Sequence, residues 1–190
     1  MISIIDYGLG NIQAFKNIYD RLNIPCTFAS SLEDIKLATK LILSGVGSFD
    51  WAMSRLNESG LIESINDEVL NNKKPILGVC VGMQIMANSS DEGNKNGLGW
   101  IPTSIRKLSI DSNSNLVLPH MGWNNVKPLN NNDLFRDIKD LNFYFLHSFF
   151  IDLDNSDKKI AESVYGQKFC CAFNYQNIYG TQFHPEKSHD

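Results

Sequence analysis

The sequence lacks any concentration of positive charge. Of its 190 residues, 17 are Lys or Arg and 21 are Asp or Glu, so the formal net charge at pH 7 is −4. Proteins that bind nucleic acids or anionic membranes by electrostatic attraction usually carry a basic stripe or patch. We therefore predict neither a nucleic acid nor a membrane surface as a partner.

Long apolar runs and a secretion signal are also missing. The longest mostly apolar stretch, residues 75–87, is too short to span a bilayer and contains Gln84. The N-terminus has no basic region and reaches an acid at Asp6, which argues against a signal peptide. We expect a cytoplasmic protein.

Cysteine is scarce, and its spacing is not that of a metal or redox motif. The four cysteines, Cys26, Cys80, Cys170 and Cys171, show no C-x-x-C pattern. The adjacent pair at 170 and 171 would point to opposite faces of a strand. We expect reduced thiols, and no metal and no cofactor is predicted.

What is present is an ordinary globular composition, 43% hydrophobic and 20% charged, in a chain of about one domain's length. The first half alternates strand and helix patterns, with strands predicted at residues 2–6, 26–29, 40–45 and 75–79 and helices at 12–22, 30–36, 49–57 and 61–69. Ser30 and Glu33 have the spacing of a capping box. This alternation predicts a parallel sheet with helices on both faces.

The second half consists mainly of strand patterns, at residues 104–110, 142–151, 159–166, 168–173 and 178–183. Residues 174–177 fit a hairpin loop between the last two strands. Residues 1–190 are therefore predicted to form a single α/β domain. Its largely parallel central sheet would carry antiparallel additions in the C-terminal half.

Cys80 stands between Gly78 and Gly82, where a predicted strand meets a predicted helix. A nucleophile on such a sharp turn adopts strained backbone angles and needs small neighbours on either side. The turn exposes the sulfur at the carboxyl end of the sheet and at a helix N-terminus, which favours the thiolate. It also aims the Val81 backbone N–H at a developing oxyanion. An inert cysteine buried in the core fits this stretch equally well.

A histidine and a carboxylate near the C-terminus favour the nucleophile over the inert cysteine. His184 and Glu186 are two residues apart on a predicted extended segment, so their side chains would share one face. Pro185 stiffens the segment where it leaves the sheet. His184 could then face Cys80 while Glu186 fixes the imidazole, which is the arrangement of a nucleophile, a base and an orienting acid.

Seven motifs carry a resemblance along nearly the whole chain: "DYGLGN" (6–11), "SGVGSF" (44–49), "LGVCVGMQ" (77–84), "GLGWIP" (97–102), "LPHMGWN" (118–124), "YFLHSF" (144–149) and "YGTQFHPEKS" (179–188). In this order they resemble the class I (triad) glutamine amidotransferases. The stretch "PHMGWN" is similar to the HisH family, the glutaminase subunits of imidazole glycerol phosphate synthase in histidine biosynthesis. The resemblance implies a flavodoxin-like fold.

The resemblance also implies a reaction. Cys80 would attack the side-chain amide of glutamine, with His184 protonating the departing ammonia and then activating water against the thioester. Glu186 would hold the imidazole. The implied oxyanion donors are the backbone N–H of Val81 and one from Val46 and Gly47, where glycines let the chain approach a ligand closely.

Other matching positions imply contacts with substrate and partner. Four residues match positions that contact L-glutamine: Gln84, Glu92, Ser148 and Phe149. Three match positions that face the ammonia-receiving synthase, which is a (β/α)8 barrel: Met121, Trp123 and Asn11. From the residues alone, Gln84 could be a solvated helix residue, Glu92 ordinary surface and Trp123 core packing. We place Trp123 on a turn that begins at a proline, and interpret His120 and His147 as structural.

Three features depart from the family pattern. Ser44 stands where proline is usual and is expected to loosen the oxyanion strand. Phe149 replaces a common tyrosine and removes a hydroxyl. The sequence stops four residues after Glu186, where family members continue into a closing helix. We therefore expect a domain without that helix, whose edge is exposed or covered by a partner.

Other functions fit parts of the sequence. A paralogous glutaminase that feeds a sugar amidotransferase of surface-polysaccharide biosynthesis would share every catalytic residue, so only the partner distinguishes it. A non-catalytic regulatory subunit would keep the fold, but the intact Cys80, His184 and Glu186 argue against it. A cysteine peptidase of the same sheet type would leave "PHMGWN" without a role.

Overall fold

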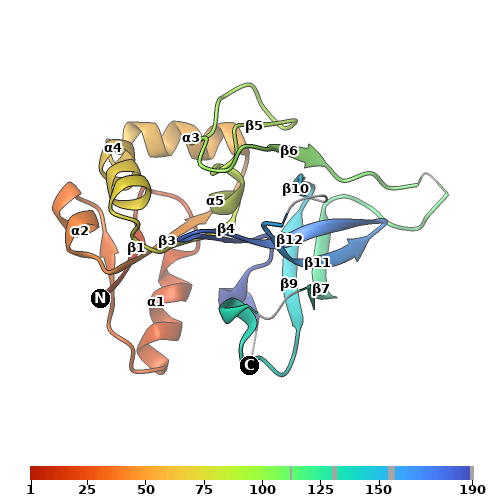
Figure 1. Ribbon diagram of the computed structural model, residues 1–190. Helices are drawn as coiled ribbons and strands as arrows, with labels where there is room; N and C mark the ends of the chain where they lie inside the picture. Colours follow the sequence, from red (N-terminus) through yellow and green to blue (C-terminus); the bar gives the residue numbers. More distant parts are fainter. Residues whose placement is uncertain (112, 130–131, 154–156, 189–190) are drawn as a thin grey trace.

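The computed structural model describes residues 1–111, 113–129, 132–153 and 157–188. Within these residues, eleven strands form one sheet, whose main path runs β2-β1-β3-β4-β13-β12-β10-β6-β5, and two further strands, β7 and β9, pair separately. Figure 1 shows helices packed on the part of the sheet formed by the early strands and layered strands at the other end. The predicted α/β architecture is confirmed.

The parallel part of the sheet holds the first strands of the chain and one late strand: β1 (Ile2–Ile5), β2 (Cys26–Ala29), β3 (Lys40–Gly45), β4 (Ile76–Cys80) and β13 (Ile178–Thr181). β1 pairs with β2 and β3, and β4 pairs with β3 and β13, all in parallel. β3 and β4 are mainly apolar and almost completely buried, as expected for parallel strands covered on both faces.

The helices are α1 (Ile12–Arg21), α2 (Leu32–Leu37), α3 (Phe49–Glu58), α4 (Ile62–Asn66), a π-helical turn (Asp67–Asn71) and α5 (Val81–Gln84). Figure 1 shows α1 on one face of the sheet and α3, α4 and α5 on the other. Among the described residues, the longest of these helices falls well short of the length and apolarity needed to cross a membrane.

The rest of the sheet comes mainly from the second half: β5 (Ser89–Ser90), β6 (Ser104–Lys107), β8 (Lys127–Pro128), β10 (Phe149–Ile151), β11 (Lys159–Tyr165) and β12 (Gln167–Tyr175). These strands pair antiparallel, except that β5 pairs with β6 in parallel. β12 joins the two parts, because it pairs antiparallel with β13, β10 and β11. The separate pair is β7 (His120–Asn125) and β9 (Asn142–His147), and the 3-10 turns are η2 (Asp133–Phe135) and η3 (Pro185–Lys187).

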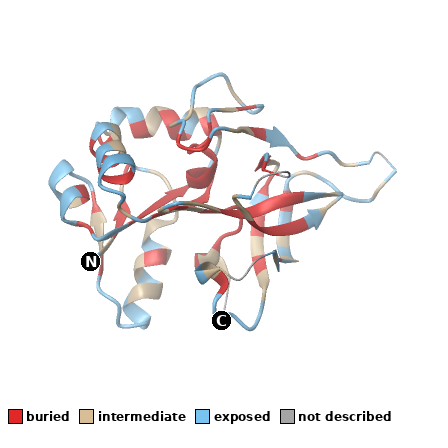
Figure 2. Ribbon diagram, viewed as in Figure 1, coloured by how far each residue is buried: buried red, intermediate tan, exposed pale blue. Residues whose placement is uncertain are grey.

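β12 separates two hydrophobic cores. Cys170 belongs to the larger core, between the parallel strands and their helices, and Cys171 belongs to the smaller one, which β9 also lines. Both thiols are completely buried, and all four cysteines are free. The prediction that the adjacent pair points to opposite faces is confirmed. Figure 2 shows the buried residues concentrated along these central strands.

Several predicted boundaries shift. The capping box of α2 is made by Ser31 and Asp34, not by Ser30 and Glu33. Ser31 Oγ accepts from Asp34 N at 3.2 Å, and Asp34 Oδ2 accepts from Ser31 N at 2.9 Å. The helix predicted at 61–69 divides into α4 and the π-helical turn, and the hairpin loop narrows to residues 176–177 because β12 and β13 pair to the end of each strand.

A groove lies along the sheet face beside α1. Its volume is about 390 Å³, and its lining includes Ile2, Tyr19, Ile42, Leu77 and Tyr179. Tyr19 comes from α1 and the others from β1, β3, β4 and β13. Part of the parallel sheet is therefore accessible to solvent from this side.

Candidate active site

Cys80 lies at a strained turn between β4 and α5. Its backbone dihedral angles are φ 54° and ψ −117°, which residues with a side chain rarely adopt. A Cβ added at Gly82 would lie 1.9 Å from the Leu43 carbonyl oxygen, and one added at Gly78 would lie 2.7 Å from Met83 Cα. Both glycines are required because neighbouring backbone fills the space of a side chain.

The end of β3 lies beside this turn. Gly45 pairs in register with Cys80, and Val46 and Gly47 follow it with exposed positions. A Cβ at Gly45 would lie 2.4 Å from the backbone nitrogen of Gly82. The sequence predicts that both glycines of this segment, Gly45 and Gly47, make room for a ligand. Gly45 makes room for protein backbone instead, so the prediction is wrong for this residue. Gly47 has φ 87°, so its backbone shape depends on glycine.

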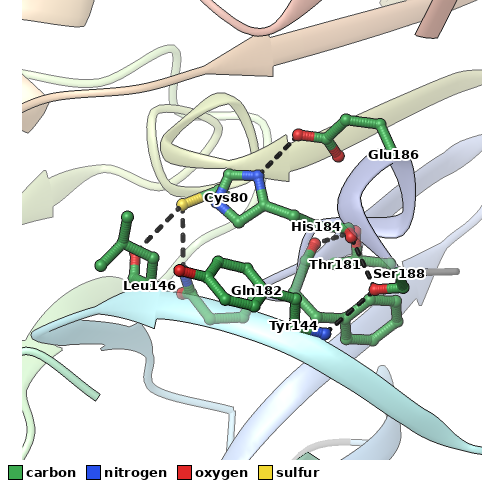
Figure 3. Close-up of polar contacts among 9 residues, drawn as sticks. Cys80, Tyr144, Leu146, Thr181, Gln182, His184, Glu186 and Ser188 are labelled. Carbon is green, nitrogen blue, oxygen red and sulfur yellow. Dashed lines mark hydrogen bonds and ion pairs between the residues drawn. The ribbon is translucent and has the colours of Figure 1, made fainter. Parts of the chain in front are cut away.

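His184 reaches the turn from the neighbouring strand. β13 pairs with β4 up to Thr181 and Val79, and His184 follows three residues later. Its Nδ1 lies 2.8 Å from Glu186 Oε1, and both side chains are almost completely buried. Figure 3 shows the imidazole between the Glu186 carboxylate and the Cys80 sulfur. The structure thus brings together the three residues predicted as a triad.

Glu186 reaches the imidazole by a route other than the predicted one. It lies in the 3-10 turn η3, not on an extended segment, and Pro185 occupies the first position of that turn. Proline favours such a position because its φ is already set for a helical turn and it needs no N–H donor there. The turn brings the carboxylate back to the ring.

The environment of His184 favours its charged form. Burial lowers the pKa of the imidazole, but hydrogen bonds with Cys80 and Glu186 and the negative charge of both groups outweigh burial and raise it to about 9. Since Nδ1 faces the carboxylate, Nε2 is left for the sulfur. The site can therefore hold an imidazolium beside a cysteine at neutral pH.

The backbone of β9 holds the histidine in place. His184 N donates to the Tyr144 carbonyl oxygen at 2.8 Å, Tyr144 N donates to Ser188 Oγ at 3.0 Å, and Ser188 Oγ donates to the His184 carbonyl oxygen at 2.7 Å. The motifs around Tyr144 and Ser188 are recognisable in the sequence, but a contact made through main chain leaves no side-chain signal. The sequence therefore does not predict this clamp.

Gln182 and Leu146 also contact the sulfur. Gln182 Nε2 donates to Cys80 Sγ at 3.7 Å, and the thiol donates to the Leu146 carbonyl oxygen at 3.8 Å. Cys80 is only 3% exposed. Gln182 is missing from the predicted site, although its place two residues before His184 was a usable signal, because residues at this spacing on a strand share a face.

Comparisons with known proteins agree with this geometry. A family model described as "Glutamine amidotransferase class-I" matches residues 4–190. A protein of Bdellovibrio bacteriovorus named "Imidazole glycerol phosphate synthase subunit HisH" is 54% identical over 100% of this chain and 94% of its own length. A protein of the same name from Leptospira interrogans is 48% identical over the same shares. The chain belongs to the HisH family of class I glutamine amidotransferases.

Solved structures share the fold of this amidotransferase. One, titled as a glutamine amidotransferase, gives a TM-score of 0.76 at 14% identity and covers 100% of this chain and 92% of that chain. A glutamine amidotransferase from Thermotoga maritima gives 0.65 at 20% identity, with coverage of 97% of this chain and 75% of that chain. At such low identity the likeness concerns the fold alone, and the predicted class I amidotransferase fold is confirmed.

The residues predicted to contact glutamine occupy two places in the amidotransferase. Gln84 is buried at the end of α5, the helix that follows Cys80, and its Nε2 donates to the Phe149 carbonyl oxygen at 2.9 Å. The solvated-residue alternative for Gln84 is therefore wrong. Ser148 precedes Phe149 where β9 gives way to β10. Glu92 lies elsewhere, in the turn after β5. Its Oε2 accepts from the backbone nitrogen of Phe49, the first residue of α3, at 2.7 Å.

The residues predicted to face a partner are exposed. Met121 is 67% and Trp123 47% exposed, but both lie on strand β7 rather than on a turn. The strand forms because β7 finds a full antiparallel partner in β9. Asn11 is half-buried at the start of α1, after the carboxyl end of β1, which is the sheet edge where β4 presents Cys80.

Ser44, which the resemblance predicts to loosen the oxyanion strand, is completely buried in β3 and paired with Val79. Its carbonyl oxygen accepts from the Tyr7 hydroxyl at 2.8 Å. Its own Oγ has no hydrogen-bond partner among the described residues. The strand thus keeps its register up to Cys80 at the expense of one buried, unpaired hydroxyl.

Proposed function

We propose that Cys80 is the nucleophile of a glutaminase reaction. Its thiolate attacks the side-chain amide carbon of L-glutamine, and the C–N bond breaks as the His184 imidazolium gives its proton to the amide nitrogen, which leaves as ammonia. Neutral His184 then takes a proton from the water that attacks the thioester, which releases glutamate and the thiolate. The observation that carries the proposal is the buried His184–Glu186 pair beside a cysteine at a strained turn.

The backbone supplies the donors for the oxyanion of both steps. Val81 N–H stands at the start of α5, directly after the nucleophile, and the Val46–Gly47 segment follows the strand that pairs with Cys80. Donors of this kind are pre-organised and act where charge develops. Gln84, Glu92, Ser148 and Phe149 bind the substrate.

The ammonia goes to a synthase partner. The relatives named as HisH subunits of imidazole glycerol phosphate synthase are similar to this chain over its whole length, which supports a heterodimer with a (β/α)8 cyclase in histidine biosynthesis. Four free cysteines fit a reducing, cytoplasmic setting.

The exposed face of β7 and β9 is where the partner docks. Met121 is opposite Leu146, and Trp123 is opposite Tyr144, so the four side chains lie on one face of the strand pair. The carbonyl oxygens of Tyr144 and Leu146 contact His184 and Cys80. Docking on this face therefore bears on the backbone that holds the site. Asn11, at the start of α1, is proposed as a further partner contact.

A labelling experiment tests the chemistry. A glutamine-mimicking electrophile is added to the chain with and without its co-purified partner, and modified cysteines are located by mass spectrometry. We expect labelling at Cys80 and loss of glutamate release of at least about 10³-fold in Cys80→Ala. Cys26→Ser, which changes a free thiol away from the site, is the matched control. An unlabelled Cys80 in the presence of partner contradicts the proposal.

Purification of the partner tests the pathway. A cyclase barrel bound to the tagged chain supports histidine biosynthesis, whereas an ATP-using sugar amidotransferase would assign the chain to a paralogous route. We expect glutamine hydrolysis by the isolated chain to be weak and to rise strongly with partner and acceptor. Equal rates with and without the partner would contradict the coupling.

A further inference from the structure

A buried chain of amide groups ends at the Cys80 sulfur. Gln182 Nε2 donates to Sγ at 3.7 Å, Gln84 Nε2 donates to Gln182 Oε1 at 3.1 Å, and the same Gln84 nitrogen donates to the Phe149 carbonyl oxygen at 2.9 Å. Gln182 is completely buried and Gln84 is 3% exposed. Figure 3 shows Gln182 directly beside the sulfur.

The direction of this chain is set at its far end. A backbone carbonyl only accepts hydrogen bonds, so Gln84 must present its NH2 group to Phe149. The second hydrogen of that NH2 group then requires an acceptor, which is Gln182 Oε1. Gln182 consequently has to present its own NH2 group to Cys80. The reverse orientation would set two donors against each other and point an oxygen at the sulfur.

The Phe149 carbonyl is itself held by a histidine pair. His147 Nδ1 donates to it at 2.9 Å, and His147 Nε2 lies 3.0 Å from His120 Nδ1. Burial lowers the pKa of His147 to about 3 and that of His120 to about 4, so both rings are neutral, and each shares hydrogen bonds as one donor and one acceptor. These two histidines are structural and keep the anchor in place.

A second group beside the sulfur, the Leu146 carbonyl, favours the neutral thiol rather than the thiolate. The Leu146 carbonyl oxygen accepts from the thiol at 3.8 Å, and it has nothing to offer a thiolate, since a thiolate has no proton to donate. The titratable groups that face Cys80 are His184, backed by Glu186, and Tyr7. Besides the imidazole, the Gln182 amide therefore favours the charged sulfur.

We propose that Gln182 is a positioning residue that donates a hydrogen bond to the Cys80 thiolate and is itself oriented by Gln84. This inference rests on the proposed role of Cys80 as nucleophile. The Gln182 hydrogen bond is stronger when the sulfur is charged, because a hydrogen bond to an ionised acceptor is stronger than one to a neutral acceptor. Removing the donor should therefore change the charge state of the thiol more than the fold.

The pH dependence of Cys80 alkylation tests this role in the isolated chain. Iodoacetamide is added across a pH series, and the peptide containing residue 80 is quantified by mass spectrometry for the wild type and two variants, Gln182→Met and Gln182→Glu. We expect the alkylation midpoint to rise by about one pH unit in Gln182→Met, with about tenfold slower labelling below it. The rise should be larger in Gln182→Glu, which places a carboxylate beside the sulfur.

Thr181→Val is the matched control. Thr181 is the preceding residue, is buried, and donates to the Phe183 carbonyl oxygen at 3.2 Å rather than to the sulfur, so its variant should keep the wild-type midpoint. Gln84→Met adds a second test that spares Gln182, and a smaller rise is expected. Circular dichroism selects folded variants for comparison. Unchanged midpoints in folded Gln182 and Gln84 variants would overturn the proposal.

Glutamate release in the presence of partner separates this inference from the proposed function. Shifted midpoints in a chain without glutaminase activity would leave the positioning role standing and reject the function. Glutaminase activity together with unchanged midpoints would support the proposed function and reject the positioning role of Gln182.

Discussion

His184 is buried beside two groups that favour its protonated form, and this links stability to pH. Its folded-state pKa is raised from 6.5 to about 9. The stabilisation gained from a raised pKa is fully present below the unfolded value and is lost as the pH rises through the folded value. This stabilisation is therefore lost as the pH rises from near neutral to mildly alkaline.

We predict that the melting temperature of the wild type falls between about pH 6.5 and pH 9 because the imidazolium loses its proton in the folded state. His184→Gln should lack this component of the decline. Thermal unfolding followed by circular dichroism across the pH range measures it. Parallel curves for the two proteins would contradict the assignment.

Ser44 offers a second test at the residue scale. Its completely buried hydroxyl has no partner among the described residues, and an unpaired buried polar group costs about 1–3 kcal/mol. Ser44→Ala should therefore raise the free energy of unfolding by about 1 kcal/mol, measured by urea denaturation. In the control Ser163→Ala, a buried hydroxyl that donates to the Asn125 carbonyl oxygen at 2.7 Å is lost, and stability should fall instead.

At the scale of elements, the turn between β4 and α5 depends on a close approach to β3. The backbone of Gly82 lies against the Leu43 carbonyl, so that an added Cβ would lie 1.9 Å from the oxygen. Both sides of this contact are backbone in regular elements and have little freedom to move. Glycine here serves packing, and the strained residue is Cys80.

We predict that Gly82→Ala lowers the free energy of unfolding by more than about 3 kcal/mol, because the strand and the turn must separate. Gly60→Ala is the matched control. Gly60 has φ +71° and nothing within 4 Å of an added Cβ, so only backbone strain of about 1 kcal/mol is expected. Chemical denaturation of both variants checks the difference, and equal losses would contradict the packing argument.

At the scale of the whole molecule, the face of β7 and β9 joins the proposed partner surface to the site. Side chains at Met121 and Trp123 lie outside, while the backbone of the paired strand contacts His184 and Cys80. Helix α2 lies at the opposite end of the molecule (Figure 1). A change on one face should therefore affect partner binding and a change at α2 should not.

We predict that Trp123→Ala weakens partner binding by at least about tenfold, because buried aromatic residues dominate interface energies. Titration calorimetry with the co-purified partner measures the affinity, and electrophile labelling of the isolated chain at Cys80 should stay unchanged. Leu37→Asp, which alters a 69% exposed residue of α2, is the control. Equal affinities for the Trp123 and Leu37 variants would place the interface elsewhere.

The alternating strands and helices, the glycine-flanked cysteine and the histidine with its carboxylate were predictable from the sequence. Each depends on local periodicity or on the backbone freedom of a few neighbouring residues. Gln84 was predicted to contact substrate, but its hydrogen bonds to Phe149 and Gln182 could be identified only from the tertiary structure. Its neighbours in space are distant in sequence.

The same reasoning explains what the sequence did not predict. The Tyr144 and Leu146 carbonyl oxygens contact His184 and Cys80 through main chain, and every residue type carries that group, so no pattern of side chains marks it. The contact of Gln182 with the sulfur follows from the parallel register of β4 and β13. The sequence determines the reactive side chains, because residue type and spacing along the chain are enough to identify them. The groups that orient these side chains are decided by the tertiary structure, because they depend on which strands pair and in what register.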